Sequence, residues 1–153
     1  MPSINLSLMR FLNFPSNMKV LALLLGFLGF LDFAYLTFKH YSGILVPCGV
    51  AECETVLTSS YSTFFGIPVA LFGAAYFLLF LVFLVAFIDT GKPLFFRMAF
   101  SLPVLALPIS LWFLYVQAAL LHAYCLYCLA SDVFTGALVI LLLLSFRRGA
   151  VEK

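Results

Sequence analysis

Residues 124–146 read YCLYCLASDVFTGALVILLLLSF, so a Cys-x-x-Cys pair opens a run that is otherwise almost wholly apolar. A helix needs roughly 20 apolar residues to cross the hydrocarbon core of a bilayer. The run therefore predicts a membrane-spanning helix that carries two thiols where the chain enters lipid.

Three other stretches are also long and apolar enough to span a membrane: Met18–Phe38, Gly66–Ile88 and Met98–Ala119. The chain has 153 residues, of which 65% are hydrophobic and 9% are charged, whereas about a quarter of the residues in a soluble domain are charged. The first stretch is longer than the apolar region of a signal peptide, so we interpret it as a retained helix. With Tyr124–Phe146, these spans predict an all-α integral membrane protein, a four-transmembrane-helix bundle. The net charge of +2 is too small to indicate a nucleic-acid partner.

Basic residues are distributed unevenly between the two ends of the predicted helices. Lys39 alone lies between the first and second spans, and seven residues flank the opposite ends: Arg10, Lys19, Lys92, Arg97, Arg147, Arg148 and Lys153. Cytoplasmic segments are enriched in Lys and Arg. The bias predicts cytoplasmic segments at 1–17 and 147–153 around a membrane domain of residues 18–146. The loop 39–65 then faces outward, where we expect it to cap the bundle.

All four cysteines fall on the predicted outer side, where disulfides form and persist. Cys125 and Cys128 are three residues apart, so on a helix they share a face in its first turn. The N-terminal end of a helix stabilises a thiolate, which favours a reactive pair. Alternatives are a static disulfide, which would stabilise little across so short a loop, and a zinc site, which the lack of a second Cys-x-x-C motif disfavours. We expect no metal.

The other pair, Cys48 and Cys53, lies in a loop of 27 residues between Lys39 and Phe65. Loops of this length are usually functional or disordered, and this one is too apolar for a disordered segment. A loop closed by its own structural disulfide is the alternative. Four cysteines allow three pairings, and the sequence does not choose among them. Two pairs on one side of a membrane can pass electrons by thiol–disulfide exchange, and a lipophilic quinone is the natural acceptor within a bilayer.

Several motifs together resemble the vitamin K epoxide reductase family, in its microbial disulfide-forming branch. They are LDFAYL at 31–36, the C-x4-C pair of the loop, VLTSSYSTFFGIPVALFG at 56–73 and YCLYCLASD at 124–132. The resemblance extends over residues 20–146. Quinone reductases of the DsbB type carry their Cys-x-x-Cys in the first outer loop, whereas here the motif opens the fourth helix.

The resemblance implies a bundle around a quinone of the ubiquinone, menaquinone or vitamin K type, in the plasma (inner) membrane. Cys128 would lie nearest the quinone, Cys125 would exchange with Cys53, and Cys48 would form the mixed disulfide with a partner. Ser59 matches a serine that the family places near the active site. No thioredoxin-like domain follows the last helix, so the expected partner is a separate DsbA-like protein.

One departure from the family concerns Asp132, which occupies the position of a tyrosine that helps hold vitamin K in the animal enzymes. Its presence favours plain quinone reduction, with Ser59, Cys128 and Asp132 as the expected quinone contacts. Asp132 lies one turn below Cys128, so it could relay a proton to the quinone, or its side chain could extend to water at the membrane interface.

Five further positions have two interpretations each. Asp32 either serves the reaction or forms a hydrogen bond inside the bundle. His122 either stabilises a thiolate or is an exposed loop residue. We expect Gly66, Gly73 and Ala74 to permit close helix packing rather than to bind a ligand.

The sequence thus predicts a membrane thiol oxidoreductase that oxidises an extracytoplasmic thioredoxin-like partner and reduces a membrane quinone, supporting disulfide bond formation. The alternatives are a vitamin K quinone or epoxide reductase and a non-catalytic four-helix membrane protein with structural disulfides.

Overall fold

Four long helices make up most of the protein in the computed structural model, which describes residues 16–44, 46–47 and 52–151. They are α2 (Ser16–Ser42), α4 (Val69–Thr90), α5 (Pro93–Tyr115) and α6 (Leu126–Val151). A π-helical turn, η1 (Val116–Leu121), continues α5. All four are long and apolar enough to cross a membrane. The predicted all-α membrane bundle is confirmed.

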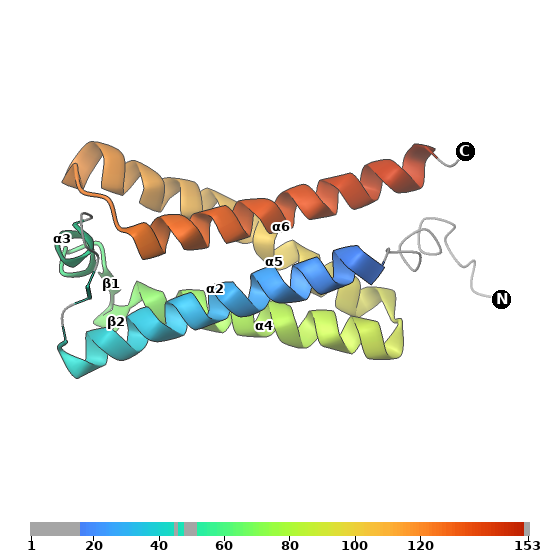
Figure 1. The fold of residues 1–153 in the computed structure, drawn as a ribbon, viewed down its shortest axis with the longest axis horizontal. Coiled ribbons are helices and arrows are strands. Elements are labelled where there is room, and N and C mark those ends of the chain that lie inside the picture. Colours follow the sequence, from blue (N-terminus) through green and yellow to red (C-terminus); the bar gives the residue numbers. More distant parts are fainter. Residues whose placement is uncertain (1–15, 45, 48–51, 152–153) are drawn as a thin grey trace.

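The helices run side by side, and the segment between α2 and α4 covers one end of the bundle (Figure 1). It contains a short helix, α3 (Cys53–Leu57), and an antiparallel pair of strands, β1 (Thr63–Phe64) and β2 (Ile67–Pro68). The start of α2, the α4–α5 connection and the end of α6 lie at the opposite end (Figure 1). Cys48 and most of the predicted segment 1–17 lie outside the described residues.

Glycines on α2 allow it to lie close against α4, with which it makes its most extensive packing. A Cβ atom added to Gly29 would lie 2.4 Å from the Phe77 ring, and one added to Gly26 would lie 2.9 Å from the Phe80 ring. On α4, a Cβ at Gly73 would lie 2.6 Å from Phe33. Small residues at helix contacts are typical of membrane bundles, and the packing role expected of Gly73 agrees with this geometry.

Gly66 corrects one expectation, because it lies in the turn between β1 and β2 and not in a helix. A Cβ atom added to it would meet nothing within 4 Å. Phe65 and Gly66 have φ angles of 52° and 79°, and positive φ at both central residues is typical of a tight hairpin turn. The apolar run had suggested that the second span begins at Gly66. Pro68 instead ends the hairpin, and α4 begins at Val69.

The core lies where all four helices meet. Its fully buried side chains include Ala22 of α2, Phe77 and Phe80 of α4, Ala99 of α5 and Leu138 of α6. Large apolar side chains on the outer faces remain exposed, as Phe27, Val82, Leu105 and Ile140 illustrate. Such an exterior suits lipid. Two prolines, Pro103 and Pro108, lie inside α5.

Gly29→Ala should destabilise the bundle by about 1–3 kcal/mol, the usual cost of overpacking a core. The added methyl would overlap the ring of Phe77, which is fully buried. Gly136→Ala is the matched control, since its Cβ would meet nothing within 4 Å and alanine favours a helix. Thermal unfolding of both variants in detergent tests this, and equal stability of the two would contradict the packing account.

Candidate functional site

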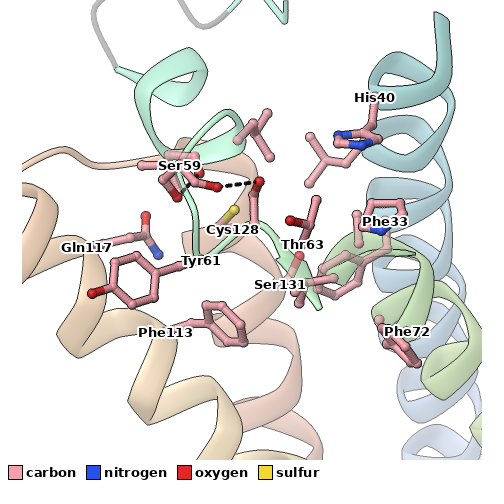
Figure 2. Close-up of a pocket in the computed structure, with 18 of the residues that line it drawn as sticks. Phe33, His40, Ser59, Tyr61, Thr63, Phe72, Phe113, Gln117, Cys128 and Ser131 are labelled. Atoms are coloured by element: carbon pink, nitrogen blue, oxygen red, sulfur yellow. Dashed lines mark hydrogen bonds between the residues drawn. The ribbon is translucent and has the colours of Figure 1, made fainter. Parts of the chain in front are cut away.

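A cavity of about 620 Å³ lies at the end of the bundle that α3 and the hairpin cover (Figure 2). Its walls come from all four long helices, from η1 and from residues 54–63 of the covering segment. Most of the lining is apolar, and Phe33, Phe72 and Phe113 contribute aromatic rings. Binding sites for small organic molecules have volumes of roughly 300–1,000 Å³ and a similar mix of apolar walls with few polar groups.

Cys125 precedes α6, which corrects the expectation that both thiols lie on the helix. Its carbonyl oxygen accepts a hydrogen bond from the Leu129 N–H at 3.0 Å, so Cys125 occupies the N-cap position. Its own N–H donates to the Oε1 atom of Gln117 in η1, at 2.8 Å. The turn that carries the cysteines is therefore held to the end of the third membrane-spanning helix.

The Cys125 thiol is fully buried and free of a disulfide. A hydrogen bond from the Cys128 thiol lowers the pKa of Cys125, and the N–H groups of Cys128 and Tyr127 act in the same direction against the effect of burial. These N–H groups belong to the first turn of α6 and have no partner within the helix. The helix N-terminus thus stabilises the thiolate of Cys125.

Cys128 is also a free thiol, but it is partly exposed and lines the cavity, whereas Cys125 does not. Figure 2 shows its sulfur atom below the segment that carries Ser59. Cys53 begins α3, is fully buried and is disulfide-bonded. Because α3 packs against η1, Cys53 and Cys125 both lie on segments held by that turn.

Ser59 and Asp132, the other two residues expected near a quinone, also line the cavity. The Ser59 hydroxyl donates to the Val56 carbonyl at 2.7 Å, and the Ser59 carbonyl accepts from the Ser62 hydroxyl at 2.8 Å. Two serines thus shape the turn between α3 and the hairpin. The oxygen of the Ser59 side chain keeps its capacity to accept a further hydrogen bond.

A stripe of polar side chains follows α6 inward from the cysteines. Cys128, Ser131, Asp132 and Thr135 recur at helical spacing and all line the cavity. A polar side chain within a membrane bundle is costly unless another group satisfies it. The stripe therefore needs partners on the neighbouring helices.

Two of the other long helices, α2 and α5, supply such partners. The Ser131 hydroxyl donates to Asp32 of α2, and the Ser110 hydroxyl of α5 donates to Oδ1 of Asp132. Tyr76 of α4 lies beside Thr135. Asp32 thus forms a hydrogen bond inside the bundle, and Asp132 contacts α5 rather than extending to water.

Gln117 is the site residue that sequence reasoning missed. It is 1% exposed although its side chain is an amide. A glutamine in an otherwise apolar span, eight residues before a Cys-x-x-Cys motif, was the available signal. His122 is exposed and does not line the cavity, as its loop interpretation expects.

The model of the Vitamin K epoxide reductase family matches residues 20–143 of the chain. The matched region begins in α2 and ends in α6. It includes the covering segment and all four cysteines. It accounts for well over half of the chain.

Removal of the Cys128 thiol should raise the pKa of Cys125, because the hydrogen bond from that thiol contributes most to the stabilisation of its thiolate. A thiolate forms as pH rises through the pKa, so Cys128→Ala should titrate at higher pH than Cys128→Ser, whose hydroxyl can still donate. Both variants would carry serine at positions 48 and 53, so that Cys125 alone titrates.

Thiolate absorbance in the ultraviolet, measured against pH, reports this titration. A chain that also carries Cys125→Ser serves as the blank for tyrosine absorbance. If the Ala and Ser variants gave the same curve, the Cys128 thiol would not be the donor that stabilises Cys125.

Proposed function

The chain belongs to the vitamin K epoxide reductase family, and we propose that it oxidises the dithiol of an extracytoplasmic thioredoxin-like protein and passes the electrons to a membrane quinone. Members of this family are membrane oxidoreductases. The proposal rests on the different positions of the two cysteines of the Cys-x-x-Cys motif. Cys128 lines an apolar cavity, and Cys125 does not. This reaction would support disulfide bond formation.

The cavity fits a quinone head group in size and in chemistry. Its volume of about 620 Å³ suits a substituted ring. Ser59 and Asp132 offer hydrogen-bonding oxygens on the wall that also carries Cys128. A quinone accepts two electrons and two protons and leaves as the quinol. We propose Cys128, Ser59 and Asp132 as its contacts, for a quinone of the ubiquinone, menaquinone or vitamin K type.

The electrons would reach Cys128 by two disulfide exchanges. The partner dithiol attacks the Cys48–Cys53 disulfide at Cys48 and leaves as a disulfide, with the loop pair reduced. Cys53 then attacks Cys125 of an oxidised Cys125–Cys128 pair and releases the Cys128 thiolate toward the cavity. Cys48 displaces Cys125 from Cys53, which restores the loop disulfide. Each cycle transfers two electrons and two protons, so one dithiol becomes one disulfide.

The lowered pKa of Cys125 favours the last exchange. A thiol with a lower pKa leaves faster in disulfide exchange, and the N–H groups at the start of α6 lower the pKa of the leaving thiol. The packing of α3 against η1 supports an exchange between Cys53 and Cys125.

We propose a multi-pass protein of the plasma (inner) membrane with both termini cytoplasmic and the redox site outside. Lys19 lies near the start of α2, and Lys92 and Arg97 lie at the start of α5. These helix ends lie opposite α3 (Figure 1), which agrees with the rule that basic residues remain inside. The redox partner would be a separate DsbA-like protein. A non-catalytic bundle with structural disulfides would not require a thiol on the wall of an apolar cavity.

Cys53→Ala should trap a mixed disulfide between the partner and Cys48. The thiol that would resolve this adduct is absent in the variant, so the adduct should accumulate. Non-reducing electrophoresis should show a heavier band that disappears with dithiothreitol. Turnover of Cys53→Ala at the wild-type rate would rule out the proposed order of exchange.

Cys128→Ser should abolish quinone reduction and leave the loop pair able to oxidise one equivalent of partner dithiol. Cys125→Ser is the matched variant, because it removes a thiol of the same motif but retains Cys128 on the cavity wall. Single-turnover kinetics with excess partner would follow quinone absorbance and partner thiols separately. If Cys128→Ser still reduced quinone at the wild-type rate, Cys128 would not be the cysteine that faces the quinone.

A further inference from the structure

Reduction of a quinone consumes two protons, which have to reach the cavity from one end of the bundle or from the other. The partner dithiol releases two protons at the end that carries α3 when it becomes a disulfide. If the quinone takes up two protons from that same end, no net charge crosses the membrane. If it takes them from the opposite end, every turnover moves charge. The path of the protons therefore decides whether the reaction generates a membrane potential.

The half of the bundle farther from α3 offers no polar path to the cavity among the described residues. A cluster of buried apolar side chains fills it, and none of them lines the cavity. Phe77 and Phe87 of this cluster are ten residues apart on α4, which corresponds to about 15 Å along a helix. On α6 the polar stripe ends at Thr135, and the buried residues beyond it include Leu138 and Leu142. A proton cannot cross such packing, because an unpaired charge is costly to bury and an apolar region holds no water.

The end that carries α3 is polar and open by contrast. Residues 58–63 each carry a hydroxyl group, and all of them line the cavity. Ser60 is exposed, as are two further lining residues, Glu54 and His40. Figure 2 shows His40 on α2, across the upper part of the cavity from Ser59. Because a hydroxyl group both donates and accepts hydrogen bonds, it can pass a proton to a neighbour or to water.

We infer that the protons for quinone reduction enter from the α3 end, between residues 58–63 and His40, so that the reaction moves no net charge across the membrane. The inference rests on the proposed function and adds to it the side of proton uptake. His40 transfers the protons at this entrance, since histidine is the side chain most often used as a proton carrier at neutral pH. It is exposed and also lines the cavity.

Other charged or titratable groups surround this entrance. The His40 ring contacts the ring of Tyr41 edge-on, with centroids 5.8 Å apart. The remaining groups share the cavity lining with His40 and come from α2, α3, the turn after α3, α4 and α6: Lys39, Glu54, Tyr61, Tyr76, Cys128 and Asp132.

The test places the protein in liposomes, with reduced thioredoxin as a dithiol that cannot cross the membrane and decylubiquinone as the acceptor. Only molecules whose α3 end faces outward can react, so a mixed orientation of the protein does not disturb the result. A pH-sensitive dye trapped in the lumen reports protons taken from the opposite end, and quinone absorbance reports turnover. An imposed pH difference that persists through the assay shows that the membrane is tight to protons.

The lumenal pH should stay constant while quinol forms. Uptake of one or two lumenal protons per quinol would make the lumen alkaline and would overturn the inference, although the proposed function would stand. Absence of quinol would contradict the proposed function and the inference with it. The two failures are therefore distinguishable.

His40→Ala should slow quinol formation by protein reduced beforehand at least tenfold. The loss should be smaller than the roughly 100-fold or more of a positioned general acid, because water at the entrance partly replaces the imidazole. Imidazole in the outer solution should restore much of the rate, which it could not do for a structural defect.

His122→Asn is the matched control for His40→Ala. It replaces the other histidine of the chain, which is exposed and does not line the cavity, and asparagine tolerates the φ of 52° at this position. This variant should react like the wild type and should not respond to imidazole. A wild-type rate in His40→Ala, or a slow rate that imidazole does not restore, would exclude His40 as the group that transfers the protons.

Discussion

Polar groups inside a membrane bundle have to find their partners within the protein, because lipid offers none. This constraint sets the orientation of α6. Ser131 and Asp132 bond to Asp32 and Ser110, which lie on two different helices. Rotation of α6 about its axis would break both bonds and turn the Asp132 carboxyl away from its partner. The same orientation places Cys128 on the cavity wall, so the position of the reactive thiol depends on hydrogen bonds that take no part in exchange.

Close packing elsewhere in the bundle complements this arrangement. The glycines of α2 allow its backbone to approach α4, and the rings of Phe77 and Phe80 fill the space at that contact. The core is therefore dense in the middle of the bundle. Toward the end that carries α3 and the hairpin, smaller and polar side chains such as Ala106, Ser110 and Ser131 line a cavity. The covering segment with α3 and the hairpin closes that end (Figure 1).

Much of this fold could be predicted from the sequence, because length and hydropathy alone identify helices that span a bilayer. Spacing and resemblance also named Cys128, Ser59 and Asp132, which the structure brings to one cavity. Two local features could not be predicted. The hairpin turn at Gly66 lies inside an apolar run, where hydropathy does not distinguish a strand from a helix. The N-cap position of Cys125 depends on Gln117, which the chain brings to it by a π-helical turn.

The N-cap position changes the roles of the two thiols in the motif. On a regular helix, the N-terminal N–H groups would act on both thiols of a Cys-x-x-Cys pair. Here the first turn of α6 acts on Cys125, which also receives the hydrogen bond of Cys128. In the proposed reaction, Cys125 is then suited to leave during disulfide exchange, whereas Cys128 lies on the cavity wall. In the proposed function, the motif would thus separate exchange with the loop from reaction with the lipid-soluble acceptor, although only two residues lie between the cysteines.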